Sequence, residues 1–258
     1  MQDVDKIKVS LMRLKPGDKV LDIGCSSGIQ GSMIARQGLE VHGVDNSQKL
    51  IARFQADLSQ DHLNCHPIVA DARQLPYADN SFDAVVSTEV FEHVPEPNAI
   101  AVEAFRVLQP GGIACISVPT EFSEYLFRRI HPSWVEDSQH INIFHVRLQP
   151  NTFEVPCLLN LRALLEQAGF RIIRIEKENF EWSVFWIFHS LVGSRFDFTG
   201  TPTEHQWLSN LIFRGWRLLD MLKVGIALKW LGNHVLPKSI YIYAEKASSN
   251  VTGQKLRL

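Results

Sequence analysis

The sequence carries almost no net charge, which narrows the classes of partner that it can bind. Its 258 residues include 26 Lys and Arg against 28 Asp and Glu, so the formal charge is −2 at pH 7. Binding of nucleic acid through its phosphates needs a basic surface, and a balanced chain has no overall basic field to supply one. We therefore expect no DNA partner, and RNA is disfavoured as well.

Cysteine is scarce, and long apolar runs are missing. The four cysteines lie 40, 50 and 42 residues apart, without the close pair of a zinc knuckle or redox motif, so we expect buried, reduced thiols. The first six residues contain two acids and no apolar run, unlike a secretory signal. No stretch reaches the about 18 apolar residues of a membrane-spanning helix. These absences predict a cytoplasmic protein, with peripheral contact at the inner face of a membrane left open.

Apolar runs of strand length alternate with helical patterns along most of the chain. Such alternation is typical of βαβ units. The sequence therefore predicts an α/β fold with a doubly wound, mostly parallel sheet, in which ligands bind at the carboxyl ends of the strands. Strands are expected at 19–24, 39–45, 67–71, 82–87, 112–118, 170–175 and 238–245, and helices at 29–37, from about 47, at 92–108 and at 158–168.

A glycine-containing segment follows the first predicted strand and reads Asp22-Ile-Gly24-Cys-Ser26-Ser-Gly28. A dinucleotide fingerprint would need glycine at 24, 26 and 29, where the chain has Gly24, Ser26 and Ile29. A carboxylate two residues before the first glycine would repel a pyrophosphate, whereas it suits an ammonium or hydroxyl group. NAD is therefore a poor fit for this segment.

The segment and the ordered series after it resemble the class I S-adenosylmethionine-dependent methyltransferases, over roughly residues 15–180. The resemblance implies a Rossmann-like, seven-stranded sheet with an antiparallel last strand between the fifth and sixth. It also implies S-adenosylmethionine as the cofactor. Ser26 stands where the family more often has glycine. By the resemblance, the residues around the methionine part of the cofactor are Asp22, Gly24, Cys25, Ser26 and Gly28.

Two further acids follow the second and third predicted strands. By the resemblance, Asp45 accepts both ribose hydroxyls of the cofactor, since a carboxylate has two acceptor oxygens. Asp71 with Ala72 contacts the adenine, and Asn46 and Thr88 also lie at the cofactor. Two plainer interpretations stay open: Asp45 caps the next helix, and the other acid lies in a solvated turn.

An acid-histidine cluster follows the fourth predicted strand. If a helix begins there, Glu89, Glu92 and His93 share one face, because residues three and four apart are neighbours on a helix. The pattern is similar to that of quinone-biosynthesis O-methyltransferases and of small-RNA terminal 2′-O-methyltransferases, where the cluster binds a divalent metal. Three interpretations stay open. They are a site for Mg²⁺ or a similar ion completed by His140, a metal-free role of His93 as general base or substrate-orienting group, and a structural role at a helix start.

Tryptophan is unevenly distributed, because five of the six lie in the last 77 residues. Residues 207–230 have the pattern of a long helix with an apolar stripe that should be buried. We interpret 183–236 as a helical cap inserted into a single domain, 1–258, whose core is about 15–182 plus a final strand at 238–246. The cap could pack as a lid on the core, contact a lipid or isoprenoid acceptor or a membrane surface, or form a dimer interface.

These features together predict methyl transfer from S-adenosylmethionine. The expected acceptor is a hydroxyl oxygen of a small or lipid-like molecule such as a phenol, quinol or sugar. In this reaction the protein aligns the acceptor and removes its proton, a task for which a histidine with a near-neutral pKa is suited. Methylation of an RNA 2′-hydroxyl and a non-catalytic, cofactor-binding partner subunit are the two alternatives.

Overall fold

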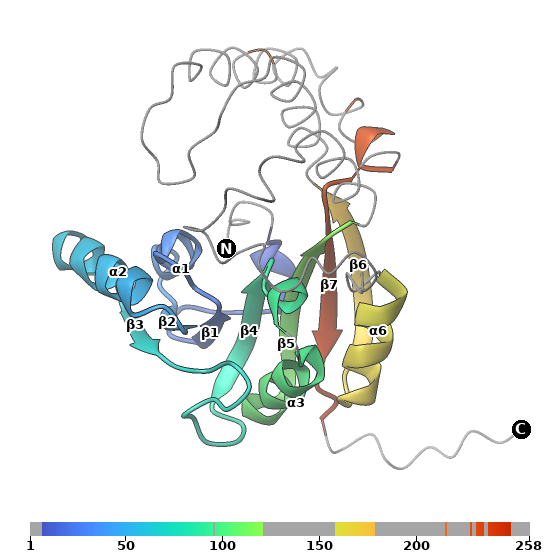
Figure 1. Cartoon of the computed structure of the whole chain (residues 1–258), viewed down its shortest axis with the longest axis horizontal. Helices are drawn as coiled ribbons and strands as arrows, with labels where there is room; N and C mark the ends of the chain where they lie inside the picture. Colours follow the sequence, from blue (N-terminus) through green and yellow to red (C-terminus); the bar gives the residue numbers. More distant parts are fainter. Residues whose placement is uncertain are drawn as a thin grey trace, which may run out of the picture. The chain divides into compact units, whose positions relative to one another are not determined.

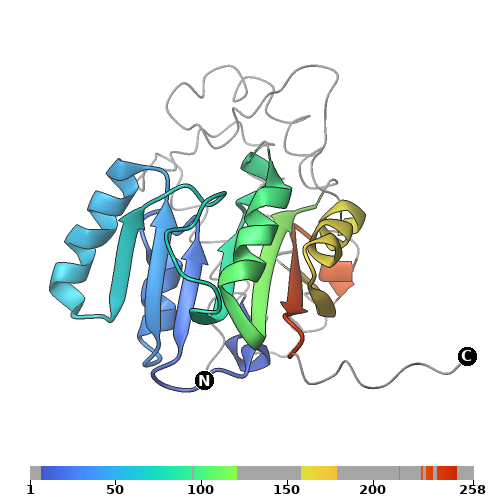
Figure 2. The same cartoon turned by 90° about the horizontal axis from the view of Figure 1, so that it is seen from below.

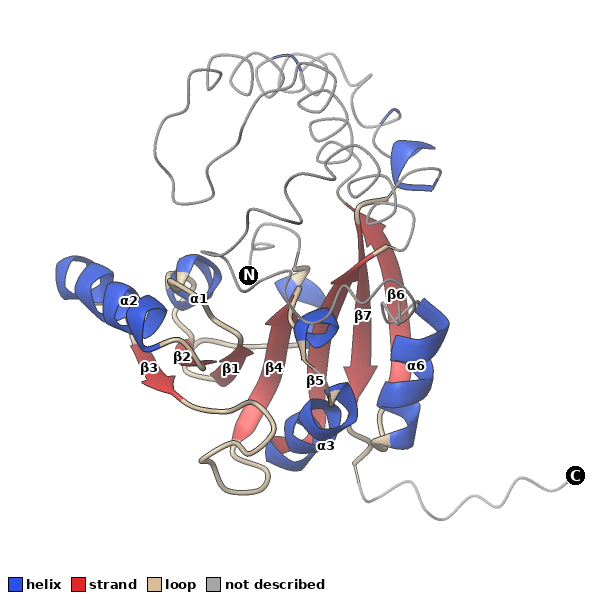
Figure 3. Ribbon diagram, in the orientation of Figure 1, coloured by secondary structure: helices blue, strands red, loops and turns tan. Residues whose placement is uncertain are grey.

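The computed structural model describes residues 7–94, 96–120, 158–178, 215, 228, 231–234 and 237–248. The chain divides into two compact units. The first consists of Met1–Val118, Glu154–Glu176 and Tyr241–Leu258, and the second of Pro119–Phe153 and Lys177–Ile240. Strands and helices alternate through the first unit, as Figure 3 shows by colour. The elements are η1 (Val9–Met12), β1 (Lys19–Ile23), α1 (Ile29–Ala35), β2 (Glu40–Asp45), α2 (Gln48–Asp61), β3 (Cys65–Val69), β4 (Phe82–Thr88), η2 (Phe91–His93), α3 (Pro97–Val107), β5 (Leu108–Pro119), α6 (Leu158–Gln167), β6 (Arg171–Glu178) and β7 (Ser239–Glu245).

The seven strands form one sheet in the order β3-β2-β1-β4-β5-β7-β6 (Figure 1). Strands β1 to β5 pair in parallel. Strand β7 runs against β5: Gly111 N–H donates to Lys246 O at one end, and Thr120 N–H donates to Lys238 O at the other. The predicted doubly wound, mostly parallel sheet with an antiparallel last strand between the fifth and sixth is therefore confirmed. Its order reverses at β1 and β4, the place where open α/β sheets bind ligands.

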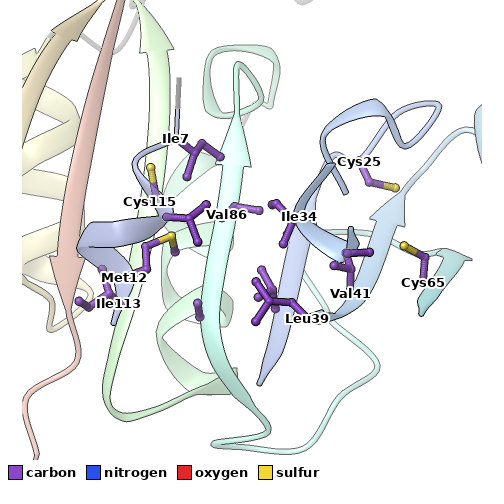
Figure 4. Packing of buried hydrophobic residues seen from close by; sticks show 14 of the residues in the cluster. Ile7, Met12, Cys25, Ile34, Leu39, Val41, Cys65, Val86, Ile113 and Cys115 are labelled. Atoms are coloured by element: carbon purple, nitrogen blue, oxygen red, sulfur yellow. The ribbon is translucent and has the colours of Figure 1, made fainter. Parts of the chain in front are cut away.

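Helices α1 and α2 cover one face of the sheet, and α3 and α6 cover the other (Figures 1 and 2). The core on the α1 face joins segments that are distant in the sequence, as Figure 4 shows. Ile7 and Met12 from the N-terminal segment belong to the same buried cluster as Ile34 of α1 and Val86 of β4, and each has at most 3% of its surface exposed. Cys25, Cys65 and Cys115 are buried free thiols, as expected, and Cys157 lies outside the described residues.

One predicted helix begins later than the pattern indicated. The sequence favoured a helix over 92–108, but α3 begins at Pro97, and only the single turn η2 precedes it. Pro97 occupies the first turn of the helix, where its missing N–H leaves no hydrogen bond unmade. The residue before a proline disfavours the helical region, and Glu96 accordingly has φ −125° and ψ 66°.

The predicted cap at 183–236 lies almost entirely outside the described residues, and so do all six tryptophans, whose uneven distribution suggested it. Gly215 and Leu228 are described there as helical residues, and both are exposed. At the helical period, Gly215 falls in the apolar stripe predicted for residues 207–230, and its exposure contradicts the expected burial at this position. In the part of the chain that the structure describes, none of the helices has the length and apolar character needed to cross a membrane.

Candidate functional site

The loop between β1 and α1 turns sharply at three residues. Gly24, Ser26 and Gly28 all have positive φ angles, of 74°, 51° and 82°. The N–H groups of Gly24 and Cys25 both donate to Val44 O, at 2.8 and 3.0 Å. Ser26 adopts the left-handed conformation although it has a Cβ, which costs about 1 kcal/mol. Hydrogen bonds therefore hold the loop against the end of β2. Its left-handed conformation suits Gly24 and Gly28 but is unfavourable for Ser26.

Protein side chains occupy the space that the missing Cβ atoms leave free at two of these glycines. A Cβ on Gly24 would lie 2.3 Å from Val90 Cγ2, and one on Gly28 would lie 2.1 Å from the Phe54 ring. Both contacts join residues that are distant in the sequence, so the glycine motif alone gives no signal of them. They lock the loop between the segment after β4 and the helix α2.

Asp45, the last residue of β2, supports this loop with its carboxylate. Its Oδ2 accepts a hydrogen bond from Ser26 N–H at 3.0 Å, and its Oδ1 accepts one from Ser47 N–H at 2.9 Å. Ser47 itself is the N-cap of α2, with its Oγ accepting from Leu50 N–H at 3.4 Å. Asp45 is therefore not itself the N-cap of α2, but it binds the backbone N–H of the N-cap residue Ser47. Each carboxylate oxygen keeps a second lone pair, so two hydroxyl donors can still bind.

Asp22, in β1, is a buried carboxylate in the same region. Only 2% of its surface is exposed, and its Oδ2 has no hydrogen-bond partner among the residues that the structure describes. Burial, helped by the charge of Asp45, raises the pKa of Asp22 to about 7. A buried polar atom without a partner is costly in a folded protein. An ammonium or hydroxyl group reaching this oxygen would satisfy it.

Asp71 lies in an exposed turn two residues after β3. Its Oδ1 accepts from Arg73 N–H at 2.8 Å, and Arg73 Nη2 donates to its Oδ2 at 2.7 Å. These hydrogen bonds hold the pKa of Asp71 below its ordinary value. Arg73 also donates to Glu96 Oε2 at 2.9 Å. Ala72, between Asp71 and Arg73 in the sequence, is half-buried. The hydrogen bonds from Arg73 thus fix the orientation of the Asp71 carboxylate. Its contact with the adenine stays a prediction.

The segment after β4 completes the edge of the site. Thr88 Oγ1 donates to Gln30 Oε1 at 2.7 Å, which connects β4 to α1. Glu89 has a left-handed backbone with φ 56°, and its N–H donates to Ser117 O of β5 at 3.1 Å. A residue in this conformation cannot be the first of a right-handed helix. The prediction that Glu89 shares one helical face with residues 92 and 93 is therefore wrong.

Glu92 and His93 nevertheless lie together in η2. His93 Nε2 is 3.7 Å from Glu92 Oε1, and their side chains are 25% and 7% exposed. Burial lowers the pKa of His93, and the charge of Glu89 opposes this effect. The imidazole is therefore mostly neutral at pH 7 and can accept a proton.

The described part of the cluster does not fit a metal ion. Among the described residues, three side chains converge closely enough to hold an ion at Glu40, His42 and His66, and not at Glu89, Glu92 and His93. His140, the expected further ligand, lies outside the described residues. The described residues of this cluster therefore act without a metal ion in the reaction considered below.

The chain is similar in sequence to known methyltransferases over the segment that carries this site. Residues 21–116, which run from within β1 to within β5, match the methyltransferase domain family. Demethylmenaquinone methyltransferase of Listeria monocytogenes is 31% identical over 182 residues, covering 66% of this chain and 76% of the relative. The chain belongs to the class I S-adenosylmethionine-dependent methyltransferases.

Two further comparisons show how far the likeness extends. Ubiquinone biosynthesis O-methyltransferase of Psychrobacter cryohalolentis is 36% identical over 124 residues, or 46% of this chain and 48% of the relative, so the chain spans about half of that relative's length. Phosphoethanolamine N-methyltransferase 2 of Haemonchus contortus, solved with S-adenosyl-L-methionine, has the same fold. Its TM-score is 0.58 at 21% identity, with 93% of this chain and 51% of that chain covered.

Proposed function

We propose that this protein transfers a methyl group from S-adenosylmethionine to a hydroxyl oxygen of a small or lipid-like acceptor of the quinol or phenol class. The observation that carries the proposal is the combination of the buried Asp22 carboxylate with the left-handed loop that Asp45 holds above the strand ends. When bound, S-adenosylmethionine supplies an electrophilic methyl group on its sulfonium. Two relatives whose names specify quinone compounds support the acceptor class.

Three carboxylates would bind the cofactor in this proposal. Asp22 accepts from the ammonium of the methionine part, which gives its buried Oδ2 a partner and a compensating charge. Asp45 accepts from the ribose hydroxyls with the lone pairs that the loop leaves free. Asp71, held by Arg73, accepts from the adenine amine. Cys25, Asn46 and Thr88 lie on the same strand ends and loops.

His93 is the general base of the proposed reaction. A hydroxyl acceptor must lose its proton, and a half-buried, neutral imidazole in η2, the turn that follows β4, is matched to that task. Glu92, 3.7 Å from the ring, stabilises the imidazolium that proton transfer creates. Glu89 contributes a further negative charge to the same group. Alignment and exclusion of water supply the rest of the acceleration.

The test uses the full chain with reduced, demethylated quinone precursors and catechols as acceptors. Calorimetry measures binding of S-adenosylmethionine, and mass spectrometry detects an acceptor that has gained one methyl group, with fragmentation to locate it on oxygen. His93→Gln should retain cofactor affinity and lose turnover. Absence of cofactor binding would overturn the proposal as a whole. Binding without turnover would favour the non-catalytic partner subunit, and methylation of carbon would overturn the oxygen assignment alone.

A further inference from the structure

Three potential metal ligands meet on one face of the sheet at the β2–β3 edge, away from the proposed methyl-transfer site. Glu40 and His42 are two residues apart in β2, so their side chains point to the same face. His66 of β3 is the register partner of His42. One ligand atom from each of the three lies within 4.8 Å of the others.

We propose that Glu40, His42 and His66 form a binding site for a divalent transition-metal ion, with zinc as the first candidate. Two imidazoles and a carboxylate form a donor set that zinc accepts, with water in the fourth position. His42 Nε2 is 2.8 Å from Glu40 Oε1. Ligand atoms in a tetrahedral zinc site stand about 3.3 Å apart, given bonds of about 2.0–2.1 Å. A small opening of this pair therefore admits the ion.

The His42 ring is held in place by aromatic neighbours. Its centroid is 4.8 Å from that of His66, and it contacts the Phe82 and Tyr77 rings edge-on at 5.3 and 5.6 Å. Phe82 is 1% exposed and therefore part of the core. A ligand whose orientation is already fixed loses little conformational entropy when the ion binds.

The other two ligands have polar partners that suit the same role. His66 Nε2 lies 2.9 Å from Asn64 Oδ1, which can only accept, so this contact leaves the lone pair on Nδ1. Contacts of this kind orient histidine ligands in metal sites. Lys19 Nζ is 3.4 Å from Glu40 Oε1, with its side chain 50% exposed. The position next to Glu40 is thus already occupied by a cation, which can move to solvent when a divalent ion replaces it.

The position of this site separates its role from methyl transfer. Glu40 is the first residue of β2, whereas Asp45, at the proposed cofactor site, is the last. Strand β3 forms one edge of the sheet and pairs with β2. An ion bound by residues of both strands would therefore hold this edge together and stabilise the fold, without taking part in methyl transfer.

The experiment titrates the tag-free, chelator-treated full chain with Zn²⁺ by calorimetry and with Co²⁺ by visible absorption. The wild type should bind one ion at this site and give the intense absorption of tetrahedral Co²⁺. Glu40→Gln and His66→Gln should each weaken Zn²⁺ binding at least about tenfold. His62→Gln, an exposed histidine at the end of α2, is the matched control and should bind like the wild type.

Lys19→Gln removes the competing cation and should tighten Zn²⁺ binding. The proposal is overturned if Glu40→Gln and His66→Gln bind as tightly as the wild type, because the ion would then be held elsewhere. It is also overturned if the wild type binds no stoichiometric Zn²⁺. Neither outcome depends on S-adenosylmethionine or on turnover, so failure here and failure of the proposed methyl transfer are distinguishable.

Discussion

Asp45 holds the backbone of Ser26, accepting its N–H at 3.0 Å and so tying the end of β2 to the loop after β1. The other carboxylate oxygen accepts from Ser47 N–H at 2.9 Å, at the start of α2. One side chain thus orders two segments, and in the proposed function it also binds the cofactor ribose. Stability and cofactor affinity should respond differently when it is changed.

Asp45→Asn retains one acceptor oxygen and loses the charge and the second acceptor. We expect a loss of about 1 kcal/mol of unfolding free energy, the value of one hydrogen bond. Cofactor affinity should fall more, at least about tenfold, because the amide cannot accept from both ribose hydroxyls while it supports the loop. Urea unfolding and calorimetry measure the two effects. Asp57→Asn, exposed on α2, is the control, and equal affinity in both variants would contradict the ribose assignment.

Asp22 makes stability depend on pH in an unusual direction. Its pKa is raised from 3.8 to about 7 in the folded protein, so between these values the folded state binds more protons than the unfolded state. Its contribution to stability is therefore full below about pH 4, declines as the pH rises to about 7 and then stays constant. In Asp22→Asn, the free energy of unfolding should no longer show the decline between about pH 4 and pH 7 that Asp22 causes in the wild type. A difference between wild type and variant that does not change over this window would contradict the prediction.

Cofactor binding should show the opposite dependence on the same group. The ionised carboxylate attracts the ammonium of the methionine part, so affinity should increase as the pH rises through about 7. Calorimetric titrations at pH 6 and pH 8 test this, and Asp22→Asn should bind more weakly at both values with less change between them. Equal affinity of the wild type at both pH values would show that the ammonium does not meet Asp22.

Gly28 and Gly17 share a left-handed backbone but differ in the space around their Cα atoms, so substituting each by alanine distinguishes a steric clash from the cost of the conformation. Gly28 and Gly17 have φ angles of 82° and 90°, but a Cβ on Gly28 meets the Phe54 ring at 2.1 Å, and one on Gly17 meets nothing within 4 Å. Gly17→Ala should cost about 1 kcal/mol for the left-handed conformation alone. Gly28→Ala should cost about 1–3 kcal/mol more, because the ring must move. Similar unfolding free energies for the two variants would contradict the proposed packing of α2 on the loop.

The sequence predicts the cofactor-binding residues best where they stand at the ends of strands that can be recognised from local patterns. Asp22 and Asp45 could be placed because apolar strand runs and their ends are local patterns, and the alternation of strands and helices fixes a parallel sheet. The antiparallel β7 came from the family resemblance, since a strand of its length carries no signal of its direction. These elements carry most of the proposed cofactor site.

Contacts between distant segments could not be predicted in this way. Val90 packs over Gly24, and His66 lies beside His42, only because strand register brings them together. The spacing of residues 40 and 42 in a predicted strand was a signal for a shared face, but nothing local indicated which residue of β3 would join them. The left-handed Glu89 was missed for a related reason: its conformation accompanies a hydrogen bond to Ser117 of β5.

His93 supplies the most direct test of the chemical step. Burial keeps its pKa below the ordinary 6.5, so the neutral form needed for proton removal predominates at pH 7. With saturating cofactor and acceptor, kcat should rise with pH and level off above a midpoint under 6.5. His93→Gln should lower kcat about 10²–10⁴-fold, the usual contribution of a general base.

Glu89 makes this prediction specific to His93. Its charge raises the histidine pKa against the effect of burial, so Glu89→Gln should shift the midpoint of the kcat profile to lower pH. A merely structural change in the loop after β4 would lower kcat without moving that midpoint. The base assignment fails if the midpoint stays fixed in Glu89→Gln, or if His93→Gln keeps the wild-type kcat, because the proton would then leave through another group.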